Sequence, residues 1–167
     1  MEIRSAADFV DYLDSIRART TRVIACIPRD RFEWSPGPGK FSFADLIRHL
    51  AATERFMWAE NAQGRPSRYP GHSRELADGP DAVLAYLDRC HAESRAIFAS
   101  LTPEQLRMKV ATPGGAAITA WKWLRAMTEH EAHHRGQIYL MLGMLGVKTP
   151  PLYGLTSEEV KARSIAH

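Results

Sequence analysis

The segment H-E-A-H-H at residues 130–134 contains two histidines four residues apart, His130 and His134. In an α-helix, residues four apart lie on the same face, one turn above the other. Two imidazoles on one face can bind a divalent metal, and a third ligand from another helix would leave a coordination position open for water or substrate. The spacing therefore predicts part of a metal site, on condition that this segment is helical.

Helical structure is indicated along most of the chain, because its apolar residues recur with a period near 3.6 and no strand-like alternation is bounded by turns. Residues 62–80 form a connection much longer than the roughly 2–8 residues usual in helix bundles, so this segment can cross the whole bundle. The pattern predicts an all-α four-helix bundle formed by one domain, residues 1–167. The predicted helices cover residues 5–27, 42–61, 80–101 and 118–145, with a turn at 103–106 and a short helix at 157–163.

His49 is the candidate third ligand, because it lies on the inner face of another predicted helix at mid-bundle depth. If its helix starts where the helix of His134 ends, the rings can meet, although the helix lengths also permit the reversed arrangement. A lone buried histidine is usually a hydrogen-bonded core residue, whereas three inward imidazoles favour a shared metal. Glu131 and Gln137 are candidates to orient ligands or water or to act in catalysis, and ordinary polar contacts are the alternative.

Charge and composition exclude several other classes of protein. The 22 Lys and Arg residues exceed the 19 Asp and Glu residues by only three and are scattered, so we expect no nucleic-acid partner. No apolar run approaches the ~18 residues required to cross a bilayer, so we expect no membrane segment. Cys26 and Cys90 lie within helical patterns, and residues 1–5 lack the apolar core of a signal peptide. We therefore expect a reduced, cytoplasmic protein.

Three stretches resemble the DinB/YfiT-like metalloenzyme family of the DinB superfamily: FADLIRHL at residues 43–50, HEAHHRGQ at 130–137 and PPLYG at 150–154. The resemblance extends over nearly the whole chain. It implies a four-helix bundle in up-down-down-up order, often a homodimer, with a divalent metal held by His49, His130 and His134. Proteins that look like this include thiol-dependent transferases and isomerases that use mycothiol, bacillithiol or glutathione, and many with no assigned reaction.

The chemistry expected of such a site follows from its ligands. Neutral imidazoles leave the metal charge uncompensated, which favours a thiolate or another anion in the open position. Imidazole suits several metals, so zinc, nickel, iron or manganese is expected, with a low-molecular-weight thiol as a further candidate cofactor. We expect a metal-dependent thiol S-transferase or hydrolase acting on a small molecule, which Arg65, Arg68 and Arg74 could receive if it is acidic. The alternative is a non-catalytic metal-binding or stress-response module.

His130 to His134 also matches H-E-x-x-H, the pattern in which Glu131 would be the general base of a zinc protease. The extended form of that pattern requires glycine at 137 and histidine at 140, where this chain has Gln137 and Leu140. A small all-α chain also lacks an edge strand that could align a peptide. Proteolysis is therefore the least favoured function.

Overall fold

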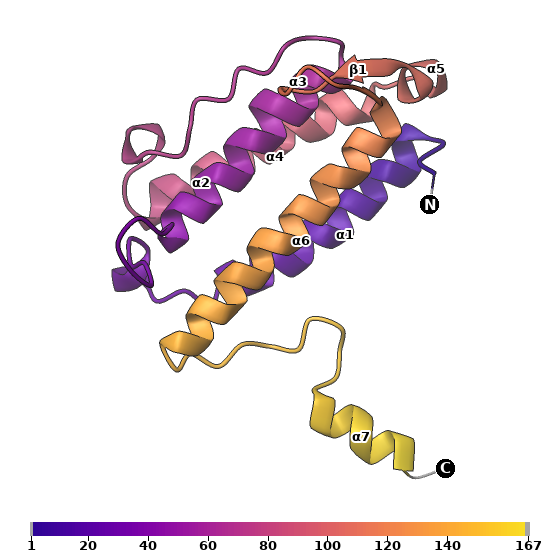
Figure 1. Cartoon of the computed structure of the whole chain (residues 1–167). Coiled ribbons are helices and arrows are strands. Elements are labelled where there is room, and N and C mark those ends of the chain that lie inside the picture. Colours follow the sequence, from indigo (N-terminus) through magenta and orange to yellow (C-terminus); the bar gives the residue numbers. More distant parts are fainter. Residues whose placement is uncertain (1, 166–167) are drawn as a thin grey trace.

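The computed structural model describes residues 2–165, and four long helical segments dominate it (Figure 1). They are α1 (Ala6–Ile24), α2 (Phe43–Thr53), α4 (Pro80–Ala99) and α6 (Ala120–Met144). The helix that begins with α2 continues through a π-helical turn, η2 (Glu54–Trp58), into α3 (Ala59–Ala62). The shorter elements are η1 (Arg29–Arg31), η3 (Arg74–Leu76), α5 (Pro103–Arg107), β1 (Lys109–Ala111), β2 (Ala117–Thr119) and α7 (Ser157–Ile165), the last of which lies away from the long helices.

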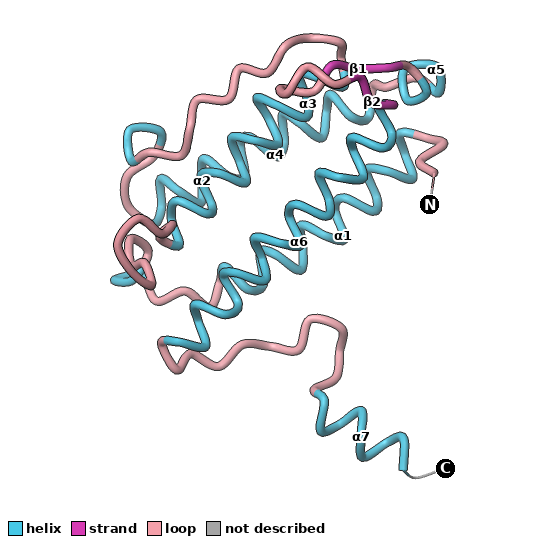
Figure 2. Tube along the Cα trace, viewed as in Figure 1, coloured by secondary structure: helices cyan, strands magenta, loops and turns pink. Residues whose placement is uncertain are grey.

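The long helices form a bundle in up-down-down-up order, as predicted. In Figure 1, α1 and α6 run in one direction, and α2 and α4 run in the opposite direction. Because α2 and α4 are parallel neighbours, the chain must return along the length of the bundle between them. Residues 63–79 make this return and appear as the long loop in Figure 2. The unusually long connection was therefore a correct indicator of the topology.

The helix ends follow from local sequence signals. Ser42 and Asp45 form the predicted capping box, in which each side chain accepts a hydrogen bond from the backbone N–H of the other residue. Pro80 occupies the first turn of α4, where the absence of an N–H costs nothing. Gly146 follows α6 with a φ of 69°, a conformation that glycine adopts without steric penalty. These residues set the start and stop of the helices that carry the candidate ligands.

A small β-hairpin precedes α6, and the expectation that the chain contains no strand was wrong on this point. Strands β1 and β2 pair antiparallel, with Val110 opposite Ile118. Each strand is only three residues long, too short for an alternating pattern to be recognised in the sequence. The hairpin also includes Ile118 and Thr119, so α6 begins at Ala120 rather than at residue 118. The fold is otherwise helical, as expected.

Two apolar clusters fill the bundle, one towards each end. The first includes Val23, Leu46 and Ile138, and the second includes Phe9 and Leu124. Polar residues from all four long helical segments are buried between the clusters, and buried polar groups destabilise a fold unless they are paired. This polar layer contains Arg17, Thr20, Glu54, Ser94, Glu131, His134 and Arg135. The layer places the candidate ligands at mid-bundle depth.

Among the helices of residues 2–165, none has the length and apolar character needed to cross a membrane.

Candidate metal centre

Three histidines from two antiparallel helices meet in the polar layer. His49 comes from α2, and His130 and His134 come from successive turns of α6. The Nε2 atom of His130 lies 3.1 Å from that of His49 and 3.0 Å from that of His134. One nitrogen from each of the three rings lies within 4.8 Å of the others. The structure thus brings together all three residues that the sequence suggested as ligands.

All three rings are neutral near pH 7. Burial, with a smaller contribution from the charge of His134, lowers the pKa of His49 to about 4. Burial, together with the charges of His134 and His49, lowers the pKa of His130 to about 3. Burial also lowers the pKa of His134, although its hydrogen bond to Gln137 acts in the opposite direction. Neutral imidazole is the form that binds a metal, so no proton has to be displaced at neutral pH.

Gln137 orients His134. Its Oε1 atom lies 2.7 Å from Nδ1 of His134, and its Nε2 atom lies 3.2 Å from Nε2 of His133. Because an amide oxygen can only accept, Nδ1 of His134 must donate to it. The proton is therefore on Nδ1, and the lone pair of Nε2 faces the other two histidines. The candidate role of Gln137 in orienting a ligand has this geometric support.

Tyr69, in the long crossover, contacts His49 in a similar way. Its hydroxyl lies 2.7 Å from Nδ1 of His49 and 3.2 Å from Nδ1 of His72. Burial raises the pKa of Tyr69, so the phenol keeps its proton. The arrangement that satisfies all three groups has His49 donating to the phenol oxygen and the phenol donating to His72. The lone pair of Nε2 in His49 then also faces His130.

The three rings form a donor set that fits a cation. With Nε2 of His49 and His134 unprotonated, His130 could offer only one proton to two acceptors. A bound divalent metal would accept a lone pair from each nitrogen and satisfy all three at once. His49 and His130 are half-buried rather than fully enclosed, so a small molecule could reach these two rings from solvent.

A buried carboxylate holds the crossover in place. Glu60 in α3 is only 1% exposed and pairs with Arg55 and Arg65 at 2.6 Å and with Arg68 at 2.9 Å. The hydrogen bond from Arg65 is the largest of several contacts that lower the pKa of Glu60 to about 2. Arg68 immediately precedes Tyr69, so this cluster positions the phenol against His49. Two of the crossover arginines considered as substrate contacts are thus paired within the protein.

We predict that Tyr69→Phe will weaken zinc binding by about 10- to 100-fold while the chain remains folded, because groups that orient metal-bound histidines typically have effects of this size. The measurement is a competition titration against a chromophoric chelator. Tyr12→Phe is the matched control, since Tyr12 is 39% exposed on α1 and far in sequence from the site. Affinities within twofold of each other in the two variants would show that the phenol does not support the site.

Glu131 takes part in a different cluster. Its Oε1 atom accepts a hydrogen bond from Thr20 at 2.6 Å, and its Oε2 atom lies 3.1 Å from Arg17 Nη2. Arg17 also pairs with Glu54, which in turn contacts His91 at 3.0 Å. Both carboxylate oxygens of Glu131 are therefore engaged by α1. The geometry gives Glu131 a role in joining the helices behind the histidines and does not favour a role as general base.

Sequence reasoning missed Tyr69 as a partner of His49, because no spacing rule relates a residue in a long loop to a helix 20 positions earlier. It also missed Arg17 and Glu54. A signal for these two was present: charged residues next to the inward stripes of two different helices require partners when they are buried.

Comparison with known proteins places these features in a family. A sequence model of the DinB superfamily matches residues 12–138. The chain is 24% identical to the uncharacterized protein YjoA of Bacillus subtilis over 147 residues, which is 86% of this chain and 93% of YjoA. Against the crystal structure of YjoA, a DinB-like protein, the TM-score is 0.71 with 20% identity, and 89% of this chain and 99% of that chain are covered.

Two further solved structures share the fold. YfiT of Bacillus subtilis, described as a probable metal-dependent hydrolase with an unusual four-helix bundle topology, has a TM-score of 0.68 at 17% identity and covers 86% of this chain and 89% of its own. A variant of a mycothiol-dependent maleylpyruvate isomerase has a TM-score of 0.61 at 16% identity and covers 81% of this chain and 63% of its own. Because the family match spans most of the sequence and the bundle has the same topology, the chain belongs to the DinB superfamily.

Proposed function

We propose that this protein is a divalent-metal-dependent enzyme, a thiol S-transferase or hydrolase, in which His49, His130 and His134 hold the metal. The observation that carries the proposal is the convergence of three neutral imidazole nitrogens within 4.8 Å of one another at an accessible site. The description of YfiT as a probable metal-dependent hydrolase and the thiol dependence of the isomerase are consistent with it. Zinc, nickel, iron and manganese are all candidate metals.

The separate roles of the metal and of the side chains follow from the three nitrogen ligands. A divalent metal bound to three neutral ligands would supply Lewis acidity toward a thiol, a water or a carbonyl group. Gln137 and Tyr69 keep two of the ligating nitrogens deprotonated and aimed at one point. The two cysteines do not serve as the nucleophile, because burial raises the pKa of Cys90 and the thiol of Cys26 is hydrogen-bonded to the carbonyl of Arg22. A thiol substrate would therefore come from outside the chain.

Proteolysis is not supported by the geometry. Glu131, the general base of an H-E-x-x-H protease, is engaged by Arg17 and Thr20. The described strands form one hairpin that ends at Thr119, 11 residues before His130. Eleven residues of helix correspond to about 16 Å, so this hairpin cannot align a peptide beside the histidines.

The test is an assay of the reconstituted protein. We expect metal loading followed by a low-molecular-weight thiol and 1-chloro-2,4-dinitrobenzene, or by an activated ester without thiol, to give turnover that depends on the metal. His130→Ala should lose this turnover, and Glu129→Ala, which removes an exposed side chain from the neighbouring position of α6, should retain it. Equal rates in parent and His130→Ala would rule out this reaction class at the site. Stoichiometric metal binding combined with that result would favour the non-catalytic module instead. The cytoplasmic location and the homodimer stay predictions from the sequence.

A further inference from the structure

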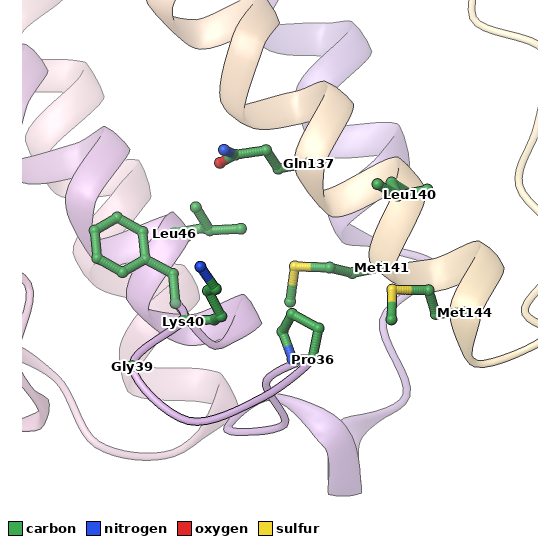
Figure 3. A pocket seen from close by; sticks show the side chains of 9 residues that line it. Pro36, Gly39, Lys40, Leu46, Gln137, Leu140, Met141 and Met144 are labelled. Atoms are coloured by element: carbon green, nitrogen blue, oxygen red, sulfur yellow. The ribbon is translucent and has the colours of Figure 1, made fainter.

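A pocket of about 340 Å³ lies between the C-terminal half of α6 and the loop that precedes α2 (Figure 3). Its wall is mostly apolar and includes Leu46 from α2 and Met141 and Met144 from α6. Leu140 and Met144 at its rim are 67% and 57% exposed. Exposed apolar side chains gathered around a concave surface are typical of a site that binds an apolar ligand.

The pocket adjoins the candidate metal centre through shared residues. Gln137 lines the pocket and also accepts the hydrogen bond from His134. Phe41 lines the opposite side, and its ring centroid lies 5.6 Å from that of His49. A molecule in the pocket would therefore contact the residues that support two of the three histidines. One end of that molecule can face the centre while its body stays among the apolar side chains.

The charges around the pocket have one sign. Lys40 is the charged residue among those that line it, and no acidic side chain is among them. In Figure 3, the Lys40 amine points from the loop toward the side where Leu46 and Gln137 lie. Gly39, with a φ of 69°, provides the turn that presents Lys40. Within residues 2–165 no carboxylate lies close enough to Lys40 for an ion pair, whereas Arg65 and Arg68 pair with Glu60.

We propose that this pocket binds a small amphiphilic monoanion whose acidic group lies beside Lys40 and whose apolar body packs against Leu46 and Met141. Lys40 is exposed, and its ammonium group at the edge of the apolar pocket favours an anion over a neutral or cationic ligand of equal size. A volume of 340 Å³ accommodates about eleven groups of the size of a water molecule. The ligand class is therefore a medium-chain or single-ring acid. The role of this ligand as a substrate rests on the proposed function, whereas the binding of the ligand to the pocket does not.

The test uses octanoate, 1-octanol and octylamine, which share a chain and differ in charge. Titration into protein labelled with ¹³C at the methionine methyl groups reports on Met141 and Met144 directly. Met108, which is 59% exposed and follows α5 at the other end of the bundle, serves as an internal reference. We expect octanoate to shift the Met141 and Met144 resonances with at least tenfold higher affinity than the other two compounds. The Met108 resonance should not move.

Two variants test the role of charge. Lys40→Gln should weaken octanoate binding by about five- to tenfold, whereas Lys109→Gln, which removes the same charge from exposed β1, should not. Met144→Glu places a carboxylate at the exposed rim and should also weaken octanoate binding without affecting the fold.

Repeating the titration with metal-free His130→Ala separates this proposal from the proposed function. Octanoate binding that persists there supports the pocket even if no turnover is found. Absence of shifts at Met141 and Met144 at millimolar octanoate, or equal affinity for octylamine, would overturn the proposal. Binding that requires the metal and is unchanged in Lys40→Gln would also overturn it, because the acid would then lie at the histidines.

Discussion

Substituting His130 with alanine will weaken zinc binding by more than about 100-fold in a chain that still folds. Loss of an orienting residue typically costs 10- to 100-fold in affinity, and loss of a ligand removes a coordinate bond as well. His130 is central to the site, because its Nε2 atom lies within 3.1 Å of the Nε2 atoms of both other histidines. The variant therefore leaves two nitrogens that no longer share a close third donor.

The measurement is elemental analysis after dialysis, followed by a chelator competition titration for zinc affinity. Glu129→Ala is the matched control, because it removes an exposed side chain from the neighbouring position of α6 that does not contact the histidines. Circular dichroism at 222 nm should show the same helix content in both variants. Retention of one equivalent of zinc by folded His130→Ala with unchanged affinity would contradict the assignment of the site.

The second large effect is expected at Arg17, where Arg17→Met should lower the free energy of unfolding by about 3–5 kcal/mol at pH 8. Arg17 is 7% exposed and pairs with Glu54 and Glu131, each of which is 3% exposed. Methionine fills similar space without charge and leaves two carboxylates buried without their cation. An uncompensated buried charge is more costly than the loss of a solvent-exposed ion pair.

The loss in the free energy of unfolding should depend on pH, and the pKa of Glu54 gives the direction of this dependence. Burial raises the pKa of Glu54, but the charge of Arg17 and the contact with His91 outweigh burial and leave the pKa below its usual value. In the parent, the stability that Glu54 contributes is therefore present above pH 4.5 and lost as the pH falls through its folded-state pKa. In Arg17→Met, we expect burial to raise the pKa of Glu54 above its value in the unfolded chain. Protonation of Glu54 at lower pH then removes part of the destabilisation caused by the substitution. The difference between parent and variant should be smaller at pH 5 than at pH 8.

Urea unfolding at both pH values measures this difference. Arg95→Met is the control, since Arg95 is half-exposed and pairs with the partly exposed Asp14, and it should cost less than about 1 kcal/mol. Arg17→Met combined with Glu54→Gln should recover part of the lost stability, because one buried charge is removed. A loss below 1 kcal/mol for Arg17→Met, or the same loss at both pH values, would show that the cluster does not stabilise the bundle.

The positions of the helices and the identity of the candidate ligands were accessible from the sequence for separate physical reasons. Helix starts depend on local hydrogen bonds such as those between Ser42 and Asp45, and these involve residues three apart. Two histidines four apart on a helix share a face whatever the rest of the fold does. The long connection predicted at residues 62–80 indicated a segment that crosses the whole bundle, because a short loop cannot return along its length. The hairpin before α6 was not predicted, because strands of three residues are too short to show an alternating apolar pattern.

Which groups surround the histidines was decided by the tertiary structure alone. The sequence placed Glu131 beside a ligand, but packing against α1 engages its carboxylate with Arg17 and Thr20. It suggested crossover arginines as substrate contacts, but Glu60 pairs with two of them, and Lys40 is the cation that lines the pocket. Periodicity reports which face of a helix is buried, whereas a hydrogen bond or an ion pair depends on which residue of another element lies opposite. The sequence by itself therefore determined the helices and the three candidate histidines, and only the packing of the helices decided that these histidines meet and what each polar side chain contacts.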